Sequence, residues 1–436
     1  MVTDNYNIKV FNPKRTRLNG GVQSWYPYYA GYSSEFVQAI IAESQLDSNS
    51  KILDPWNGCG ITTYVGLKLG YDVYGYDINP VMVLVAKAYT VKKEEAKCLK
   101  EYAELIVAKA EGIENVDGFD EEPLELWMTP KGALSFRKIE FAVNAMFVSG
   151  GKYRKLIGNN VDNVTSVASF FYLCLFRVLD EILHRFRSSN PTWIKKPLTQ
   201  RNRLAPSWDK VKKSFVETAD ILVRMAECDD LLDADNRNQC HLIKASSTHL
   251  PSDSNYFDLV ITSPPYCTRI DYAISTMPQL MLLGYHHDST FIDLRREFIG
   301  TSMVNHERKN IDVRWGETCL KFLESVSLHS SKASSSYYYF THVNYYDSLF
   351  RSIQELGRVL KVGGKCVIVL QDSYYKDVYN DVPRIVEEMC LVFGMFLIQK
   401  NSFPSKFNMA RINPSVKKYR SLAEASESVL IFEKKK

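Results

Sequence analysis

The chain has 436 residues, of which 45% are hydrophobic and 12% aromatic, so it can bury a large core in one elaborated domain or two. This composition excludes a disordered or fibrous protein. The formal net charge is only +4 at pH 7, so any contact with nucleic acid has to come from local basic patches and not from the field of the whole molecule.

The cysteines and the lack of a long apolar segment both bear on the compartment. No two of the nine cysteines form a CxxC pair, which argues against a zinc ribbon or a disulfide framework and indicates reduced thiols. No stretch reaches the ~18 apolar residues that a membrane span needs, and the N-terminus shows no apolar signal segment. The nearest candidate, residues 167–179, carries Arg177 and is better interpreted as a buried helix. We therefore expect a cytoplasmic protein with no membrane partner.

The first elements along the chain predict a βαβ unit. Residues 1–32 are polar and aromatic, with a dense aromatic cluster from 25 to 32, and a helical pattern follows at 34–44. A buried strand at 51–54 leads into a glycine turn, a helix around 62–69 and a second strand at 72–76. Strand, turn, helix and strand within about 30 residues is the spacing of a βαβ unit.

The middle of the chain predicts helices. From about 91 to 236 the apolar residues recur with helical periodicity among frequent charges, as in 94–111, 135–147, 164–187 and 208–226. Strand patterns return at 241–245 and 257–262. A polar, mixed stretch from about 273 to 344 follows, and we expect it to be a long excursion that contains helices.

The last part of the chain again alternates helices with strands. An amphipathic helix is predicted at 345–360, followed by a strand at 365–370, a helix near 383–393 and strands near 395–400 and 428–432. Alternation of this kind predicts an α/β fold with a mostly parallel, three-layer sheet. We expect residues 1–92 and 237–436 to form that domain and residues 93–236 to be a large, mainly α-helical insertion.

The first segment that carries chemistry runs from Asp54 to Gly60, directly after the apolar strand. Its glycines let the backbone approach a ligand closely at the carboxyl end of a strand, where open α/β sheets bind their ligands. The pattern is neither GxGxxG nor a phosphate-binding P-loop. Asp77 ends the next strand, at about the 20-residue spacing where an acid can hydrogen-bond both hydroxyls of a ribose. Taken singly, the glycine segment could be an ordinary tight turn, and Asp77 could be a turn residue or a helix cap. The two features at this spacing are stronger evidence for a ligand site than either one alone.

The second segment is Thr262-Ser263-Pro264-Pro265-Tyr266, which follows the strand at 257–262. Two prolines fix φ, remove two backbone donors and hold a rigid turn, which leaves carbonyl groups and the Ser263 hydroxyl as acceptors. The amino group of a base has two hydrogens to donate and a lone pair conjugated with the ring. Acceptors on those hydrogens would pull the nitrogen toward tetrahedral geometry and free the lone pair to attack a methyl sulfonium in line. Tyr266 offers a flat face for a base rotated out of its stack, although the tetrapeptide alone would also fit a β-turn.

These residues together resemble the amino-methyltransferases of DNA, and more specifically the cytosine-N4 group, whose catalytic tetrapeptide is Ser-Pro-Pro-Tyr. The adenine-N6 relatives usually carry Asp or Asn in place of the serine. The resemblance covers roughly residues 20–92 and 237–436, and it implies a Rossmann-like methyltransferase fold with S-adenosylmethionine as cofactor. It makes Ser263, Pro264, Pro265 and Tyr266 the catalytic residues.

The same resemblance implies a set of cofactor-binding residues. The glycine motif contributes Asp54, Pro55, Gly58 and Gly60, the ribose-binding acid is Asp77 with Ile78 beside it, and the aromatic cluster contributes Tyr28 and Ala30 over the methionine part. An aromatic patch against the sheet edge is the alternative for that cluster. At the third strand the family often presents an acid to the adenine, whereas this chain has Ala245-Ser246-Ser247, which leaves Ser246 as the expected contact.

The resemblance further implies DNA as the partner. The insertion at 93–236 is larger than a minimal enzyme needs, and both it and the stretch 273–344 are candidates for target recognition. Arg269 and Asp271 could contact a phosphate and a base edge, or pair with each other. Basic residues that would meet a phosphate backbone, each otherwise part of a solvated face, are Lys14-Arg15-Thr16-Arg17, Arg185, Arg187, Lys195-Lys196, Arg295-Arg296 and Lys417-Lys418-Tyr419-Arg420.

Two other features point to no chemistry of their own. Carbon-5 methylation of cytosine uses a cysteine nucleophile in a Pro-Cys context, but here Tyr266 separates Pro265 from Cys267, so we interpret Cys267 as a packing residue. The pair His286-His287 has no companion acid or cysteine at ligand spacing, so we expect no metal.

The resemblance therefore implies a site-specific DNA methyltransferase that transfers a methyl group to N4 of a flipped cytosine, with a restriction endonuclease as partner in the same system. Three alternatives stay open. The acceptor could be adenine N6 in DNA or a base in RNA, or an amide of a protein or small molecule. The chain could also be a non-catalytic methyltransferase fold that binds nucleic acid through its helical insertion.

Overall fold

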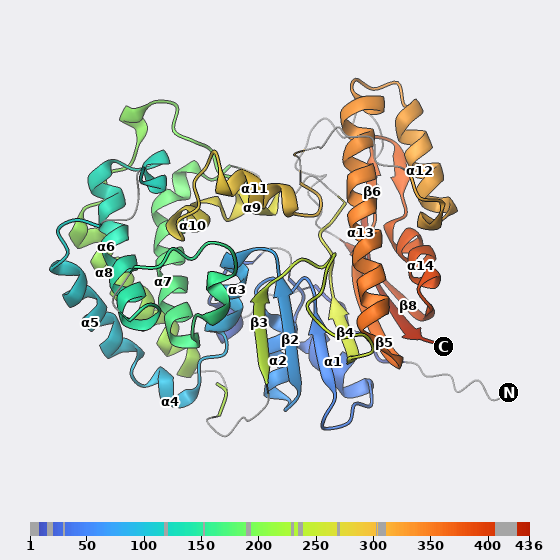
Figure 1. Ribbon diagram of the computed structural model, residues 1–436, viewed down its shortest axis with the longest axis horizontal. Helices are drawn as coiled ribbons and strands as arrows, with labels where there is room; N and C mark the ends of the chain where they lie inside the picture. Colours follow the sequence, from blue (N-terminus) through green and yellow to red (C-terminus); the bar gives the residue numbers. More distant parts are fainter. Residues whose placement is uncertain are drawn as a thin grey trace.

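A seven-stranded sheet lies at the centre of the computed structural model, which describes residues 8–14, 21–28, 31–116, 121–150, 153–188, 193–227, 231–233, 239–267, 271–301, 303, 311–405 and 425–436. The strand order is β3–β2–β1–β4–β5–β9–β8 (Figure 1). The strands are β1 (Lys51–Asp54), β2 (Asp72–Asp77), β3 (Cys240–Lys244), β4 (Phe257–Thr262), β5 (Leu360–Gln371), β8 (Met395–Ser405) and β9 (Ala425–Lys434).

The strands β1 to β5 run parallel, and β9 lies antiparallel between β5 and β8. Helices cover both faces of this sheet, so its strands are apolar on both sides. In β4, Leu259 and Ile261 pack into one hydrophobic core while Val260 packs into the other, as the two-residue period of a strand requires. The expected fold class is confirmed, since this is a Rossmann-like, mostly parallel three-layer α/β fold.

The helices of the two outer layers differ in origin. One layer consists of α1 (Ser34–Glu43), α2 (Ile61–Lys68) and α3 (Pro80–Ala88), which come from the βαβ part of the chain. The other consists of α12 (Glu317–Leu328), α13 (Tyr339–Val359) and α14 (Val382–Val392). A two-stranded hairpin of β6 (Ser373–Tyr375) and β7 (Val378–Asn380) adjoins the second layer.

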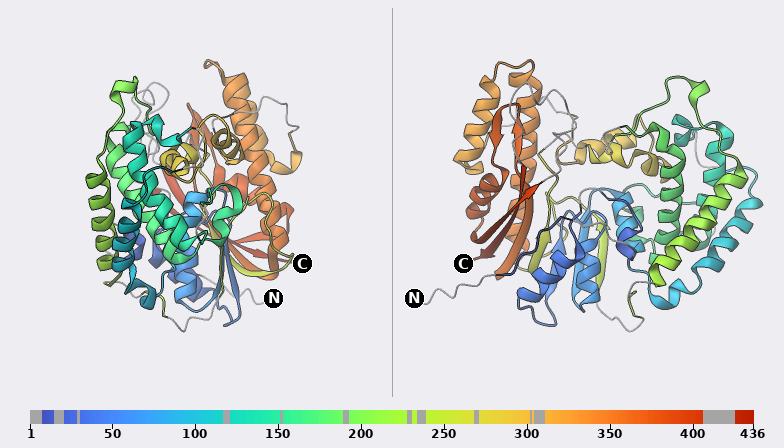
Figure 2. Two further views of the ribbon diagram at one scale, coloured as in Figure 1. Left: turned by 60° about the vertical axis from the view of Figure 1, so that its left-hand side comes forward. Right: turned by 180° about the vertical axis from the view of Figure 1, so that it is seen from behind.

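The residues between β2 and β3 form a helical region beside the sheet, seen at the left of Figure 1 and from behind in Figure 2. It contains α4 (Lys93–Ala96), α5 (Leu99–Glu111), α6 (Pro130–Phe147), α7 (Ser166–Leu183) and α8 (Trp208–Glu227). The predicted buried helix at 167–179 is part of α7, whose apolar face packs on α3. This region therefore shares one continuous hydrophobic core with one face of the sheet.

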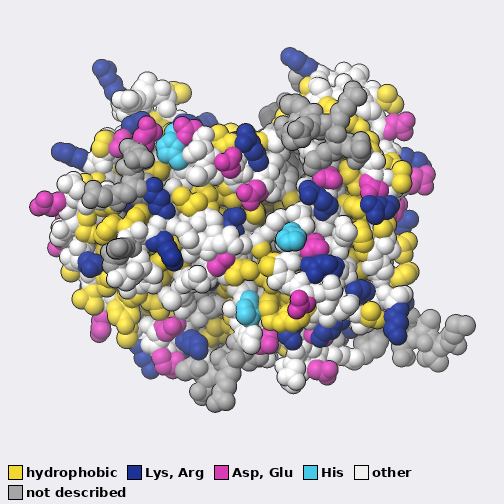
Figure 3. All heavy atoms as spheres, viewed as in Figure 1, with side chains coloured by type: hydrophobic (Ala, Val, Ile, Leu, Met, Phe, Trp, Pro, Cys, Tyr) yellow, Lys and Arg dark blue, Asp and Glu magenta, His cyan; other side chains and the backbone are white. Residues whose placement is uncertain are grey.

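The predicted excursion begins with three short helices, α9 (Tyr272–Ser275), α10 (Met277–Leu282) and α11 (Thr290–Glu297). They bridge the helical region and the sheet domain above the carboxyl ends of the strands (Figure 1). In the space-filling view the surface is hollowed at this edge, between the helical region and the part that carries α12 and α13 (Figure 3). Within the described residues, no helix has the combination of length and apolar character needed to cross a membrane.

Candidate active site

A cavity opens at the carboxyl ends of the parallel strands and brings the two predicted motifs together. Its empty volume, including the open mouth, is about 960 Å³. The motifs lie some two hundred residues apart in the chain, but β1 and β4 are neighbours in the sheet, so both motifs end at the same edge. Eleven of the predicted site residues line this cavity: Tyr28, Asp54, Pro55, Gly58, Asp77, Ile78, Ser246, Ser263, Pro264, Pro265 and Tyr266.

Asp54 is the point at which the two motifs are joined. Its carboxylate accepts hydrogen bonds from the hydroxyls of Tyr32 (2.8 Å), Thr62 (2.8 Å) and Thr262 (2.6 Å), and from the backbone N–H of Trp56 (3.1 Å). Only 2% of the residue is exposed, and this burial raises its pKa against the lowering effect of the donors. Asp54 thus holds the turn after β1 against the end of β4, immediately before Ser263.

Glycine is required at both Gly58 and Gly60, and the steric constraint differs between the two positions. Both adopt positive φ, +50° at Gly58 and +87° at Gly60, where a side chain would be strained. A Cβ on Gly58 would come within 2.9 Å of the ring of Tyr28, so that ring lies directly over the turn. A Cβ on Gly60 would come within 2.7 Å of the Cβ of Ala86, so Gly60 packs α2 against α3 behind the cavity wall. The predicted residue Ala30 lies outside the described residues.

Asp77 presents its carboxylate at the floor of the cavity. It accepts hydrogen bonds from the backbone N–H groups of Gly58 and Asn79, both at 2.8 Å. Burial raises the pKa of Asp77 to about 6, although these two donors lower it. The carboxylate therefore fixes the glycine turn and keeps lone pairs for a ligand, since each of its oxygens can accept more than one hydrogen bond.

The Ser-Pro-Pro-Tyr segment follows β4 with Pro264 buried and Ser263 and Tyr266 partly exposed. The carbonyl of Pro265 accepts a hydrogen bond from the Tyr345 hydroxyl of α13 at 2.8 Å. This carbonyl is therefore already engaged within the protein. Among the described residues, the Ser263 hydroxyl and the Pro264 carbonyl make no hydrogen bond, so these two groups are the open acceptors of the turn.

Tyr266 and Cys267 have different surroundings. The Tyr266 hydroxyl lies 3.4 Å from a carboxylate oxygen of Glu427 on β9, a buried acid whose pKa is raised by that burial. The sulfur of Cys267 lies 3.4 Å from His342 Nδ1, and burial raises the pKa of this thiol to about 12. A thiol with that pKa is a poor nucleophile at neutral pH, in agreement with its interpretation as a packing residue.

The described arginines of the predicted basic patches are largely engaged within the molecule. Arg187 pairs with Asp180 and donates to the carbonyl of Ser275 at 2.9 Å. Arg295 pairs with Asp271 at 2.7 Å, and Asp271 also caps α9. The expectation that these two arginines meet phosphates is therefore corrected, because both are used to hold α9 to α11 in place. Arg269, residues 15–17 and residues 417–420 lie outside the described residues.

The histidine pair also differs from expectation. His286 contacts Asp288 through Nδ1 and Glu121 through Nε2, the latter at 3.3 Å. His286, His287 and Asp288 bring ligand-type atoms within 4.8 Å of one another, so the premise that no acid accompanies the pair is wrong. Both ring nitrogens of His286 nevertheless lie against carboxylates, which explains the cluster as a polar network near the surface.

Several residues of the cavity and its support were missed by sequence reasoning. Tyr345 and Glu427 contact the Ser-Pro-Pro-Tyr segment, while Glu297, Phe298 and Ile299, at the end of α11 and directly after it, line the cavity. No motif marks any of them, because their positions depend on how distant segments pack. The only local signal was the density of tyrosines before and within α13.

Comparison with known proteins adds a set of distant relatives. No family model matches the chain. It is 26% identical over 340 residues to the Type II methyltransferase M.BsoBI of Geobacillus stearothermophilus, covering 70% of this chain and 61% of that protein. It is 23% identical over 411 residues to the Type II methyltransferase M.AvaI of Nostoc sp., covering 86% and 79%. It is 27% identical over 233 residues to the Type II methyltransferase M.MvaI of Kocuria varians, covering 50% and 46%. The chain thus spans about three fifths of the length of M.BsoBI.

Proposed function

We propose that this chain is an S-adenosylmethionine-dependent methyltransferase that modifies the exocyclic N4 of a flipped cytosine in DNA. The observation that carries the proposal is the pair of open acceptors at Ser263 and Pro264, beside Tyr266, in the cavity that also contains Asp77. The relatives support a methyltransferase, since each is a Type II methyltransferase by name. Serine at position 263, as in the cytosine-N4 tetrapeptide, favours cytosine over adenine.

The residues that line the cavity fit S-adenosylmethionine in their chemistry. The Asp77 carboxylate suits the two ribose hydroxyls, and the ring of Tyr28 above Gly58 can cover the methionine part. When bound, the cofactor supplies an electrophilic methyl group on a sulfonium.

The residues of the chain would prepare the acceptor nitrogen. The Ser263 hydroxyl and the Pro264 carbonyl accept hydrogen bonds from the two amino hydrogens, which draws the nitrogen out of conjugation with the ring. Tyr266 stacks on the flipped base and fixes its plane. The Asp54 network holds Thr262, and hence the start of this turn, in register with the cofactor half of the cavity.

DNA is proposed as the substrate and a restriction endonuclease as the partner enzyme of the same system. The helical insertion at 93–236 and the stretch 273–344 are proposed to recognise the target sequence. In support, α9 and the residues after α11 form one wall of the cavity, where a flipped base and its flanking nucleotides would pass.

The proposal is tested by incubating the protein with methyl-labelled cofactor and DNA, followed by nucleoside analysis. We expect labelled N4-methylcytosine. Recovery of N6-methyladenine alone would move the acceptor to adenine, and label transferred only to RNA or protein would overturn the DNA assignment. Absence of transfer, together with retained cofactor binding, would favour a non-catalytic nucleic-acid-binding role.

The pH dependence of cofactor binding is expected to follow Asp77. Ribose hydroxyls donate to a carboxylate, so affinity should be full above the pKa of about 6 and should fall as the pH decreases through it. The Asp77→Asn variant should bind about 10- to 100-fold more weakly at pH 8 and lose this pH dependence. Isothermal titration calorimetry with S-adenosylhomocysteine from pH 5 to 8 measures both effects. The control is Asp72→Asn on the same strand, whose carboxylate bonds Gln239 away from the cavity; an equal loss there would contradict the assignment.

Replacing Cys267 should leave methyl transfer nearly intact. The thiol is protonated at neutral pH and packs beside His342 and Asn380, so Cys267→Ala is expected to keep the rate within about threefold of wild type. Single-turnover transfer from labelled cofactor measures this rate. Complete loss of transfer in a folded variant would instead indicate a covalent carbon-5 mechanism.

A further inference from the structure

A second carboxylate of the cavity, that of Glu297, has no place in the reaction described so far. It is the last residue of α11, and its side chain lines the cavity although about half of its surface remains exposed. Lys244, on β3, is its ion-pair partner among the described residues, at 3.6 Å. A charged acceptor therefore points into the cavity from a segment that carries no recognised motif.

The position of Lys244 shows which half of the cavity Glu297 serves. Lys244 is the register partner of Asp77 across β2 and β3, and it directly precedes Ala245-Ser246-Ser247. The catalytic turn follows β4, three strands away from β3, a separation of roughly 14 Å at about 4.8 Å per strand. The ion pair thus places the Glu297 carboxylate on the β3 side of the cavity, the side of Asp77.

The two serine hydroxyls that follow β3 are already engaged in hydrogen bonds within the protein. The Ser246 hydroxyl is hydrogen-bonded to the Thr248 hydroxyl at 2.8 Å and accepts from the Thr248 N–H at 3.3 Å. The Ser247 hydroxyl is bonded to Ser352 of α13 at 2.9 Å. An amino group placed here would therefore find its strongest free acceptor in the Glu297 carboxylate, not in the serines.

We propose that Glu297 binds the exocyclic amino group of the adenine in S-adenosylmethionine. The inference rests on the proposed cofactor: Asp77 would hold the ribose, and Ser246 and Glu297, on the β3 side of the cavity, would hold the purine. Glu297 accepts a hydrogen bond from that amino group, and Lys244 orients the carboxylate. The excursion after the Ser-Pro-Pro-Tyr turn would thus supply an acidic adenine contact beside Ser246.

The framework around Glu297 suits a fixed binding group. Arg295, two residues earlier on α11, pairs with Asp271 at 2.7 Å, and Asp271 is only 4% exposed. Phe298 and Ile299, which follow Glu297, are buried in the two hydrophobic cores on either side. The backbone at Glu297 is therefore anchored on both sides, which holds the carboxylate in one place before the ligand arrives.

The test measures binding of two ligands that differ only at the purine amino group. The probes are S-adenosylhomocysteine and its 6-deamino analogue, in which hydrogen replaces the amino group, titrated by calorimetry into the full chain. Wild type should prefer the amino form by about 10-fold or more, since a hydrogen bond to a charged acceptor is lost with the analogue. Glu297→Ala should bind the two ligands equally, with unchanged affinity for the analogue. Glu297→Gln, which keeps an amide oxygen, should show an intermediate preference.

The matched control is Asp293→Asn on the same helix, an exposed acid that pairs with Arg296 and should leave the preference unchanged. Loss of affinity for both ligands in Glu297→Ala would indicate a structural role and overturn the inference. An undiminished preference in that variant would also overturn it, while leaving the proposed cofactor intact. Failure of wild type to bind either ligand would overturn the cofactor proposal itself, and the inference with it.

Discussion

Replacing Tyr266 by alanine is expected to reduce methyl transfer by about 100-fold or more while cofactor affinity stays unchanged. The ring provides the stacking face for the flipped base, and without it the amino group is no longer held against the Ser263 and Pro264 acceptors. Cofactor affinity should survive, because Asp77 and Gly58 come from the segments after β2 and β1 and do not depend on the side chain of Tyr266. Single-turnover transfer and calorimetric titration of S-adenosylhomocysteine measure the two quantities separately.

The matched control is Tyr266→Phe, which keeps the ring and removes only the hydroxyl. The hydroxyl contact with Glu427 is long, at 3.4 Å, so the rate should stay within about tenfold of wild type. If Tyr266→Ala transfers methyl groups at the wild-type rate, the stacking role is wrong. If Tyr266→Phe is as inactive as the alanine variant, the hydroxyl and not the ring face carries the function.

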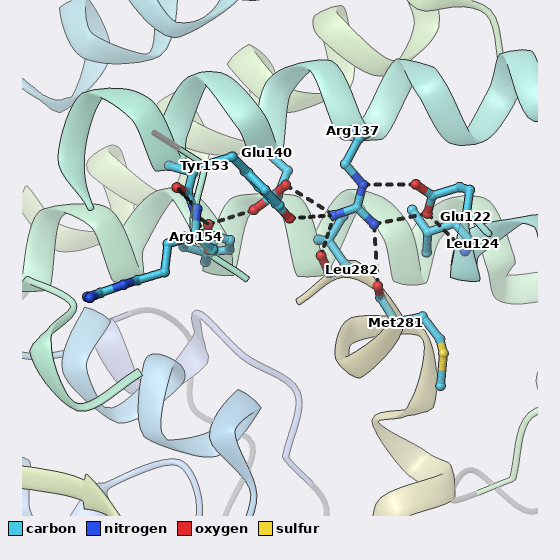
Figure 4. Close-up of polar contacts among 10 residues, drawn as sticks. Glu122, Leu124, Arg137, Glu140, Tyr153, Arg154, Met281 and Leu282 are labelled. Carbon is cyan, nitrogen blue, oxygen red and sulfur yellow. Dashed lines mark hydrogen bonds and ion pairs between the residues drawn. The ribbon is translucent and has the colours of Figure 1, made fainter. Parts of the chain in front are cut away.

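Replacing Arg137 by methionine is expected to destabilise the fold by about 3–5 kcal/mol, the range for breaking a buried ion pair. Figure 4 shows Arg137 between Glu122 and Glu140, with its guanidinium also reaching the end of α10. The residue is 1% exposed and donates to Glu122 (2.9 Å), Glu140 (3.1 Å) and the carbonyl of Leu282 (2.7 Å). Its removal leaves a buried carboxylate at Glu140 without its cation. The midpoint of urea unfolding, followed by circular dichroism, measures the loss.

The pH dependence of the stability and a second substitution show whether Arg137→Met destabilises the fold through an unpaired charge or through lost packing. Burial already raises the pKa of Glu140 and Arg137 lowers it, so the pKa should rise further in Arg137→Met. A raised pKa in the folded state means that folding takes up a proton. The loss of stability in Arg137→Met relative to wild type should therefore become smaller as the pH falls. Adding Glu140→Gln should recover part of the stability, because the amide is neutral and can still accept from Tyr172. A loss of stability that does not depend on pH and that Glu140→Gln does not reduce would point to lost packing.

The parts of the fold that sequence alone predicted are those with a local signal. The strand at 257–262 was recognisable from an apolar run that ends at two prolines, and β4 occupies those residues. By contrast α3 was missed, because all nine of its residues are buried and no polar face marks the helical period. The helix predicted from 345 begins at Tyr339, because a short π-helical turn at Ser334–Tyr338 leads into it.

Residues of the candidate site could be predicted when they belong to one short segment with a recognisable motif. Residues that reach the cavity only through the packing of distant segments were missed. Asp77 and the Ser-Pro-Pro-Tyr turn were found because a strand and its following turn suffice to place them at the sheet edge. Glu297 could not be found, because its place in the cavity depends on the packing of α11. The same limit applies to Arg295, since the sequence does not show that Asp271, 24 residues away, neutralises it.

The position of β9 has a consequence for the order in which the sheet is completed as the chain is made. This strand lies near the end of the sequence, yet it pairs with β5 on one side and β8 on the other. A growing chain therefore has a gap in its sheet until residues 425–434 have been made, and β8 has no neighbour to bind. Glu427, whose carboxylate lies 3.4 Å from the Tyr266 hydroxyl, belongs to this strand. Pairing of β9 thus closes the sheet and brings Glu427 to Tyr266 in the same folding step.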